Sequence, residues 1–327
     1  GRRRVLMWGI ALFMLATLGC IYAPNAEVFL VFRMCQAVVA VAMVLSRAVI
    51  RDLYDQDHSA SMIGYVTMGM AVVPMISPGL GGLLDEAFGW KSVFWFFFAI
   101  GGLMLWLVYV DLGETAQKSS KSLIGQFKEY PELLRSPRFW GYSLAAAFCS
   151  GSFFAYLGGA PFVGTEVFGM GPSELGFYFG APAIGYFLGN FLSGRYATTF
   201  GVNRMVLWGC IANAMGTFAS LAIFVIGLGS PLSFFGMMVF VGLGNGLVIP
   251  NATAGMLSVR PHLAGTASGL GGAIMIGGGA ALSALAGLLL TPETGAFPLV
   301  GIMCATGVCA MLAIGAVYRR ERRLALA

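Results

Sequence analysis

The stretch VFWFFFAIGGLMLWLVYV, residues 93–110, contains no charged residue. A helix rises about 1.5 Å per residue, so a run of this length crosses most of the roughly 30 Å apolar layer of a membrane. Outward from it in both directions, similar apolar runs recur along the chain, separated mostly by short polar connections. We predict ten membrane-spanning helices: 5–23, 28–50, 61–84, 92–112, 139–160, 174–193, 205–228, 232–253, 264–290 and 297–318.

Composition excludes a soluble protein. Hydrophobic residues make up 58% of the 327 residues and charged residues only 10%, against about 25% charged in soluble domains. The net charge of +5 comes from basic residues scattered between apolar runs, without the basic stripe of a nucleic-acid-binding protein. The six cysteines fall within apolar runs and show neither metal-ligand spacing nor a disulfide framework.

The basic residues also predict an orientation. One set of alternate connections holds almost all of them, including those of 113–138 and of the C-terminal tail, whereas the other set holds only Lys91. Because basic residues favour the cytoplasmic side, we expect residue 1, the 113–138 segment and the C-terminus to be cytoplasmic. Segment 113–138 has apolar residues at helical spacing, which favours an amphipathic surface helix.

The chain repeats itself at a spacing of about 200 residues. GRRRVLMWG at 1–9 matches GVNRMVLWG at 201–209, and the GLL at 82–84 lies opposite the GLL at 287–289. Two spans precede the second copy and none precedes the first, so we expect two further helices before residue 1 in a parent of six plus six helices. The expected units are 1–112, a linker at 113–138, and 139–327.

Five further patterns carry a family resemblance. Residues 1–4, GRRR, resemble the end of a loop motif, G-x-x-x-D-R-x-G-R-R/K, and residues 33–37, RMCQA, resemble R-x-x-Q-G. Residues 64–82 resemble the antiporter pattern G-x8-G-x3-G-P-x-x-G-G, with Val73 and Ser77 replacing two glycines. GAPFV at 159–163 and PNATAG at 250–255 resemble sequences near the ends of later helices.

Together these resemble the Bcr/CflA drug-resistance branch of the major facilitator superfamily. The resemblance implies an all-α polytopic membrane protein of two pseudo-symmetric six-helix bundles, which exports drugs across the bacterial inner membrane in exchange for protons by alternating access. It implies a monomer whose partners are a small-molecule drug, protons and the lipid bilayer, with no nucleic acid.

The resemblance also assigns roles to residues. It implies proton coupling for Arg33 and Gln36, and a charge inside a span is a functional candidate because its burial in lipid is costly. The conformational helix motif comprises Gly64, Pro78, Gly81 and Gly82. The cytoplasmic loop motif comprises Gly1, Arg2, Arg3 and Arg4, with Arg204 in a degenerate second copy. Aromatic, Met and Asn side chains suit a drug cavity, and the candidates are Tyr65, Met68, Phe153, Tyr156, Tyr178, Asn245 and Asn251.

Alternatives remain open on the sequence. No Ser/His/Asp set or metal-ligand constellation occurs, so we expect no enzyme activity, no metal and no cofactor. None of the ten spans has Asp or Glu in its interior, so we expect the proton-coupling carboxylate in helices before residue 1. The alternatives are a transporter of a nutrient or metabolite on the same fold, or a transport-incompetent fragment. GLGNG at 242–246 follows no strand, so it is not a nucleotide-binding loop.

Overall fold

The computed structural model describes residues 2–53, 73, 76–115, 130–260 and 263–325. All its regular elements are helices. Contacts divide the chain into two compact units, Gly1–Val73 with Leu80–Ser120, and Pro74–Gly79 with Lys121–Ala327. We call these unit 1 and unit 2 and describe each by itself.

Unit 1 is built on α1 (Arg2–Ile21), which packs against both α2 (Ala26–Cys35) and α5 (Lys91–Val110). Helix α2 begins where the side-chain oxygen of Asn25 accepts a hydrogen bond from the Val28 amide at 2.9 Å, a typical N-cap. Rings from α2 and α5 meet edge to face, with the centroids of Phe29 and Phe94 5.5 Å apart.

The predicted span 28–50 is not one continuous α-helix. Helix α2 ends at Cys35, a 3-10 turn occupies Gln36–Val39, and α3 (Ala40–Leu53) continues the chain. A 3-10 turn inside a helix tightens its winding and often marks a hinge. The turn packs on α1, and its first residue, Gln36, is buried.

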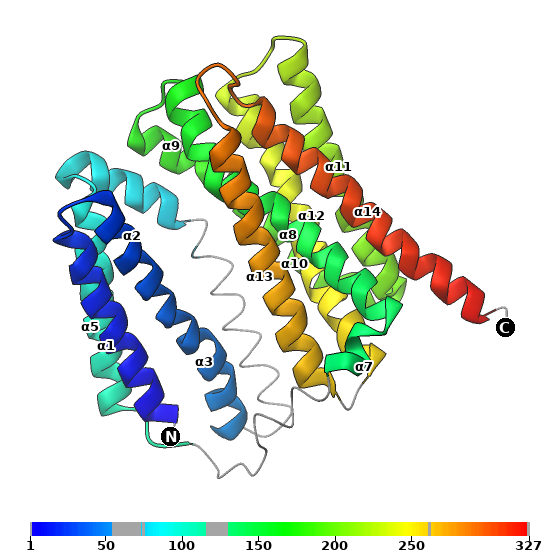
Figure 1. Cartoon of the computed structure of the whole chain (residues 1–327), viewed down its shortest axis with the longest axis horizontal. Helices are drawn as coiled ribbons and strands as arrows, with labels where there is room; N and C mark the ends of the chain where they lie inside the picture. Colours follow the sequence, from blue (N-terminus) through cyan, green and yellow to red (C-terminus); the bar gives the residue numbers. More distant parts are fainter. Residues whose placement is uncertain (1, 54–72, 74–75, 116–129, 261–262, 326–327) are drawn as a thin grey trace. The chain divides into compact units, whose positions relative to one another are not determined.

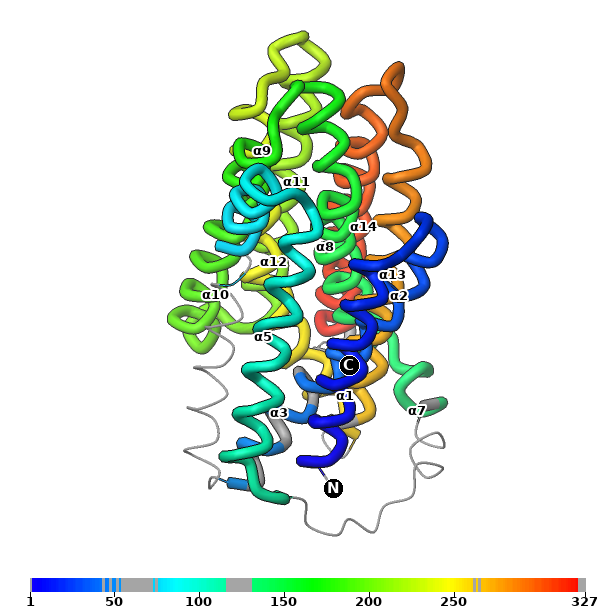
Figure 2. Tube along the Cα trace, turned by 90° about the vertical axis from the view of Figure 1, so that its left-hand side faces the viewer, coloured from blue at the N-terminus to red at the C-terminus, as the bar shows by residue number. Residues whose placement is uncertain are grey.

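In unit 2 the long helices run along one another (Figure 1). Helix α8 packs on α12, α13 and α14, and α12 packs on both α10 and α11. The neighbouring helices α10 and α12 can be followed in the tube trace (Figure 2). The elements are α7 (Tyr130–Leu134), α8 (Pro137–Phe162), a π-turn (Val163–Val167), α9 (Pro172–Phe179), α10 (Ala181–Phe200), α11 (Val202–Val225), α12 (Pro231–Val259), α13 (Ala264–Leu289) and α14 (Phe297–Ala325).

Proline and glycine explain two interruptions in unit 2. The predicted span 174–193 splits at Gly180, because Pro182 has no N–H to donate to the carbonyl of Tyr178 four residues earlier. Pro161 lies inside α8, and a π-turn follows it at Val163–Val167. Between α10 and α11 the chain turns at Gly201, whose φ of +82° favours glycine.

The sequence 242–246, GLGNG, is the packing seam of α12. A Cβ on Gly242 would overlap the carbonyl oxygen of Pro182 in α10. A Cβ on Gly246 would lie 2.6 Å from the carbonyl oxygen of Tyr186, and one on Gly244 2.6 Å from that of Gly209 in α11. Small residues in membrane helices permit this close backbone approach, which gives these glycines a structural role.

Seven helices in the described residues are long and apolar enough to cross a membrane. They correspond to the predicted spans that begin at 5, 92, 139, 205, 232, 264 and 297. Of the other three, 28–50 and 174–193 are interrupted as described above. Most of 61–84 lies outside the described residues, as does most of the amphipathic helix expected in 113–138.

Candidate functional site

A chain of three hydrogen bonds joins α2 to α1 in unit 1. The Arg33 guanidinium donates from Nη1 to Oε1 of Gln36 at 2.7 Å. The Gln36 amide donates from Nε2 to Oγ1 of Thr17 at 2.7 Å, and that hydroxyl donates to the carbonyl oxygen of Phe13 at 2.7 Å. Every donor points the same way, so the chain leads from a fixed positive charge to a backbone carbonyl.

Burial differs along this chain. Thr17 and Gln36 are only 0% and 3% exposed, whereas Arg33 is exposed at the end of α2. The guanidinium carbon lies 5.8 Å from the ring centroid of Phe94, a cation–π contact. Because its hydrogen bond to Gln36 constrains it, the guanidinium is a preorganised cation that can receive an anionic group.

The internal repeat shows that this polar chain is particular to unit 1. Arg33 and Gln36 lie eight and eleven residues after the N-cap Asn25. In unit 2, Met238 and Val241 hold the same places after the N-cap of α12 (Pro231–Val259), and both are fully buried. Helix α12 therefore packs without a polar side chain at either place. Because packing does not require polar residues there, the comparison favours a functional role for Arg33 and Gln36 in unit 1.

Three predicted cavity residues of unit 2 meet in one aromatic cluster. The ring of Tyr156 stacks on Phe179 with centroids 5.0 Å apart and on Phe153 at 6.3 Å. Tyr178 lies 5.6 Å from Phe235, which also meets Tyr156 edge to face. The rings come from α8, α9 and α12, and Tyr156 and Phe235 belong to the buried core.

Tyr156 also has a structural task. It is fully buried, and its hydroxyl donates to the carbonyl oxygen of Phe179 at 2.8 Å. That carbonyl lies at the break between α9 and α10, where the amide of Ala183 donates instead to Gly180. Of the three predicted residues, Phe153 and Tyr178 are only partly buried, so a bound molecule can reach these two before Tyr156.

The two predicted asparagines are buried inside unit 2. Asn245 donates to the carbonyl oxygen of Cys149 at 3.2 Å, and Asn251 donates to Oγ of Ser193 at 2.7 Å. Asn213, which no sequence pattern singled out, also donates to the Cys149 carbonyl at 3.3 Å. These amides connect α12 and α11 to α8, and α12 to α10. Their role in lining a cavity stays a prediction.

The arginines of the loop motif take different partners. Arg3 donates to the carbonyl oxygen of Tyr109 at 2.7 Å, near the C-terminal end of α5, where a helix leaves carbonyls unpaired. The backbone amide of Arg2 donates to the Glu114 carboxylate at 2.6 Å. Arg4 and Arg204 are exposed.

A second polar cluster, also missed in the sequence, joins α8, α11 and α14 in unit 2. Glu321 accepts a salt bridge from Arg138 at 2.9 Å and a hydrogen bond from the Asn203 amide. The hydroxyl of Tyr142 donates to the Asn203 oxygen at 2.6 Å. Asn203 directly precedes Arg204 in the second copy of the loop motif. That position is the feature of the sequence from which this cluster could have been predicted.

The remaining predicted residues belong to the conformational helix motif, the loop motif and the cavity. Pro78, Gly81 and Gly82 lie in the helical stretch 76–88, where Gly82 is buried and a Cβ on Gly81 would meet open space. The other predicted residues lie outside the described part of the chain: Gly1, Gly64, Tyr65 and Met68.

Comparison with known proteins gives the class. The model of the Major Facilitator Superfamily matches residues 1–284. An uncharacterized MFS-type transporter, YdgK of Bacillus subtilis (strain 168), is 31% identical over 96% of this chain and 78% of its own length. The chloramphenicol resistance protein of Pseudomonas aeruginosa is also 31% identical, over 98% and 76%. A bicyclomycin resistance protein homolog of Haemophilus influenzae is 25% identical, over 97% and 79%.

A solved structure supports the fold. The D-xylose–proton symporter superposes with a TM-score of 0.71 at 16% identity, over 96% of this chain and 80% of that chain. The helices, the repeat and these matches define a multi-pass membrane transporter, not an enzyme. The chain belongs to the major facilitator superfamily and is similar to two drug-resistance proteins.

Proposed function

We propose that this protein exports a small apolar or cationic drug across the bacterial inner membrane in exchange for protons, with its C-terminus in the cytoplasm. The observation that carries the coupling is the hydrogen-bonded chain of Arg33, Gln36 and Thr17. The names of two relatives, a chloramphenicol resistance protein and a bicyclomycin resistance protein homolog, support the class of substrate.

Arg33 would couple transport through charge. A guanidinium beside a carboxylate favours the ionised carboxylate and so lowers its pKa. In this proposal the proton-coupling carboxylate binds a proton when it moves away from Arg33, because its pKa then rises. When the carboxylate returns to Arg33, its pKa falls and it releases the proton. In this proposal Gln36 and Thr17 hold the guanidinium in place, and the 3-10 turn at Gln36–Val39 supplies the hinge.

The aromatic cluster of unit 2 would bind the drug. Phe153 and Tyr178 present partly buried rings, which suit flat apolar compounds by their area and organic cations through their π faces. Tyr156 would position the cluster, because its hydroxyl is already engaged by the Phe179 carbonyl.

The test is export from cells that lack their main efflux pumps and express the protein from its whole gene. A labelled phenicol or a fluorescent cation is loaded, and its loss is followed with and without a proton ionophore. Export that the ionophore abolishes supports drug/proton exchange. Uptake of a carbon source without any drug phenotype, with the protein present in the membrane, would establish the metabolite transporter instead.

Matched variants test the coupling role of the polar chain. Arg33→Gln should abolish ionophore-sensitive export. Thr17→Val should lower it about 2–10-fold, because one hydrogen bond contributes about 0.5–1.5 kcal/mol. Thr217→Val is the control, because Thr217 lies 200 residues later in the repeat and likewise donates to the carbonyl four residues before it, at 3.2 Å. Full ionophore-sensitive export by Arg33→Gln would refute the coupling role.

A further inference from the structure

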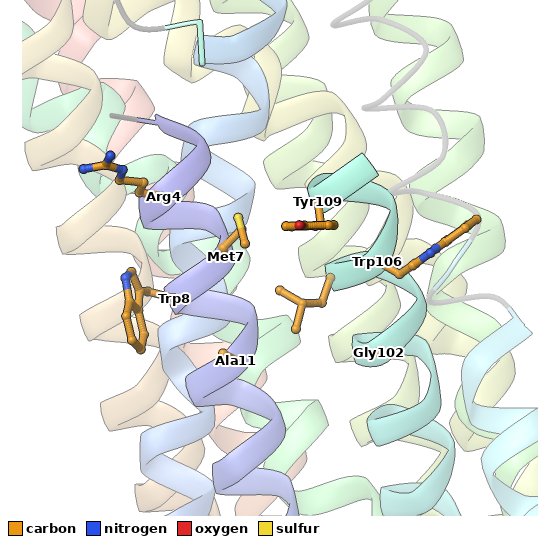
Figure 3. Close-up of a pocket in the computed structure, with 8 residues that line it drawn as sticks. Arg4, Met7, Trp8, Ala11, Gly102, Trp106 and Tyr109 are labelled. Atoms are coloured by element: carbon orange, nitrogen blue, oxygen red, sulfur yellow. The ribbon is translucent and has the colours of Figure 1, made fainter. Parts of the chain in front are cut away.

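A groove of about 520 Å³ lies between α1 and α5 in unit 1. Residues of both helices line it: Met7, Trp8 and Ala11 of α1, and Gly102, Trp106 and Tyr109 of α5. Met7 and Tyr109 point into the space between the helices, whereas Trp8 and Trp106 lie at its two margins (Figure 3). The groove is therefore apolar along its length and flanked by indole rings.

The repeat shows why the groove exists. Helices α1 and α5 of unit 1 pack as α11 and α14 do in unit 2, and the close points correspond. A Cβ on Gly101 would lie 2.9 Å from Cγ of Met14, and one on Gly307 would lie 3.3 Å from Cα of Ala214. Positions 200 residues later on α11 and 206 residues later on α14 are therefore equivalent.

Two small residues open the groove in unit 1. By this correspondence, Ala11 and Gly102 take the places of Ile211 and Val308. Trp8 is 70% exposed, whereas its counterpart Trp208 is 43% exposed and meets the ring of Phe200 at 4.9 Å. The helix pair thus packs equivalently in both units, but only the pair of unit 1 lacks branched side chains at these two positions.

One end of the groove is positively charged. Arg4 lines it, and Arg2 and Arg3 are adjacent in sequence, so three guanidinium groups outnumber the carboxylates of Asp111 and Glu114 after α5. Arg3 is engaged by the Tyr109 carbonyl, whereas the side chain of Arg4 is exposed. Arginine and aromatic rings at the end of a spanning helix occupy the depth of lipid headgroups.

We propose that the α1/α5 groove binds one anionic phospholipid. The headgroup phosphate pairs with Arg4 and with the phenol of Tyr109, and one acyl chain lies along Met7, Ala11 and Gly102 between the two indoles. Basic pockets between membrane helices select anionic headgroups in this way. The lipid completes the apolar surface that Ile211 and Val308 provide in unit 2.

Native mass spectrometry of the full chain, purified in detergent, tests the site. Phosphatidylglycerol and phosphatidylcholine are titrated separately, and the first lipid adduct is followed. We expect phosphatidylglycerol to bind at least about 5-fold more tightly. Arg4→Gln should lower the ratio of phosphatidylglycerol affinity to phosphatidylcholine affinity about 5-fold, as expected for one basic residue near the surface. Arg204→Gln, at the equivalent place in unit 2, should leave it unchanged.

A second variant fills the groove with the residues of unit 2. Ala11→Ile with Gly102→Val should abolish the first adduct while the protein still folds, because a Cβ on Gly102 would lie 3.6 Å from Cε of Met14, an ordinary contact. Thermal unfolding of the same samples confirms folding. Equal binding of both lipids, equal losses in Arg4→Gln and Arg204→Gln, or a dimer in place of the adduct would each overturn the proposal.

Discussion

Gly246 on α12 should not tolerate even one extra methyl group. A Cβ there would lie 2.6 Å from the carbonyl oxygen of Tyr186 and 2.7 Å from the amide nitrogen of Asn190. An ordinary contact of a Cβ begins at 3.4 Å, so the α10 backbone must move away by about 0.8 Å from the 2.6 Å separation. Overpacking of this kind costs about 1–3 kcal/mol.

Gly236 is the matched control, because it lies in the same helix and a Cβ on it would meet open space. Each Gly→Ala change gains the same helix propensity, about 1 kcal/mol. The difference in stability between Gly246→Ala and Gly236→Ala is therefore the overpacking cost alone, about 1–3 kcal/mol. Gly236→Ala by itself should raise the free energy of unfolding by up to about 1 kcal/mol.

The assay is thermal unfolding of both purified variants in the same detergent, followed by intrinsic fluorescence. At about 2–4 °C per kcal/mol, Gly246→Ala should unfold several degrees below Gly236→Ala. A Tm for Gly246→Ala equal to or above that of Gly236→Ala would refute the conclusion that the α10–α12 seam depends on backbone contact.

Two further predictions concern polar contacts in unit 2. Tyr156→Phe should lower the free energy of unfolding by about 1 kcal/mol, because the Phe179 carbonyl loses the hydroxyl that donates to it. Thermal unfolding measures this loss, with Tyr178→Phe as the control. Equal losses in the two variants would contradict the prediction. Glu321→Gln should lower the free energy of unfolding by less than about 1 kcal/mol at low salt and by almost nothing at high salt, because the ion pair of Glu321 with Arg138 is part-exposed. Thermal unfolding at two salt concentrations tests this. A loss of stability that does not depend on salt would argue against it.

Much of the architecture could be predicted from local patterns. Apolar runs located seven spans that the structure contains as long helices, and the match between 1–9 and 201–209 located an internal repeat. The RMCQA pattern at 33–37 singled out Arg33 and Gln36, which the structure joins by a hydrogen bond. These features are local because backbone hydrogen bonding in lipid forces each apolar run into a helix on its own.

Partners across helices could not be predicted in the same way. Thr17 completes the chain from Arg33, whereas Thr217, at the matching place of the repeat, donates to carbonyls of its own helix. Asn213 joins Asn245 at the carbonyl of Cys149 from a different helix. Such meetings depend on which faces pack together.

The sequence by itself therefore determined that this protein is a multi-pass helical membrane transporter, and it pointed to the family. Only the tertiary structure decided that Gly242 and Gly246 face α10 while Gly244 faces α11, and that Ala11 and Gly102 leave a groove. The physical reason is that lipid and a neighbouring helix are equally apolar. The division into a polar and an apolar face, which identifies the packing face of a helix in a soluble protein, is therefore missing as a guide to which helices pack together.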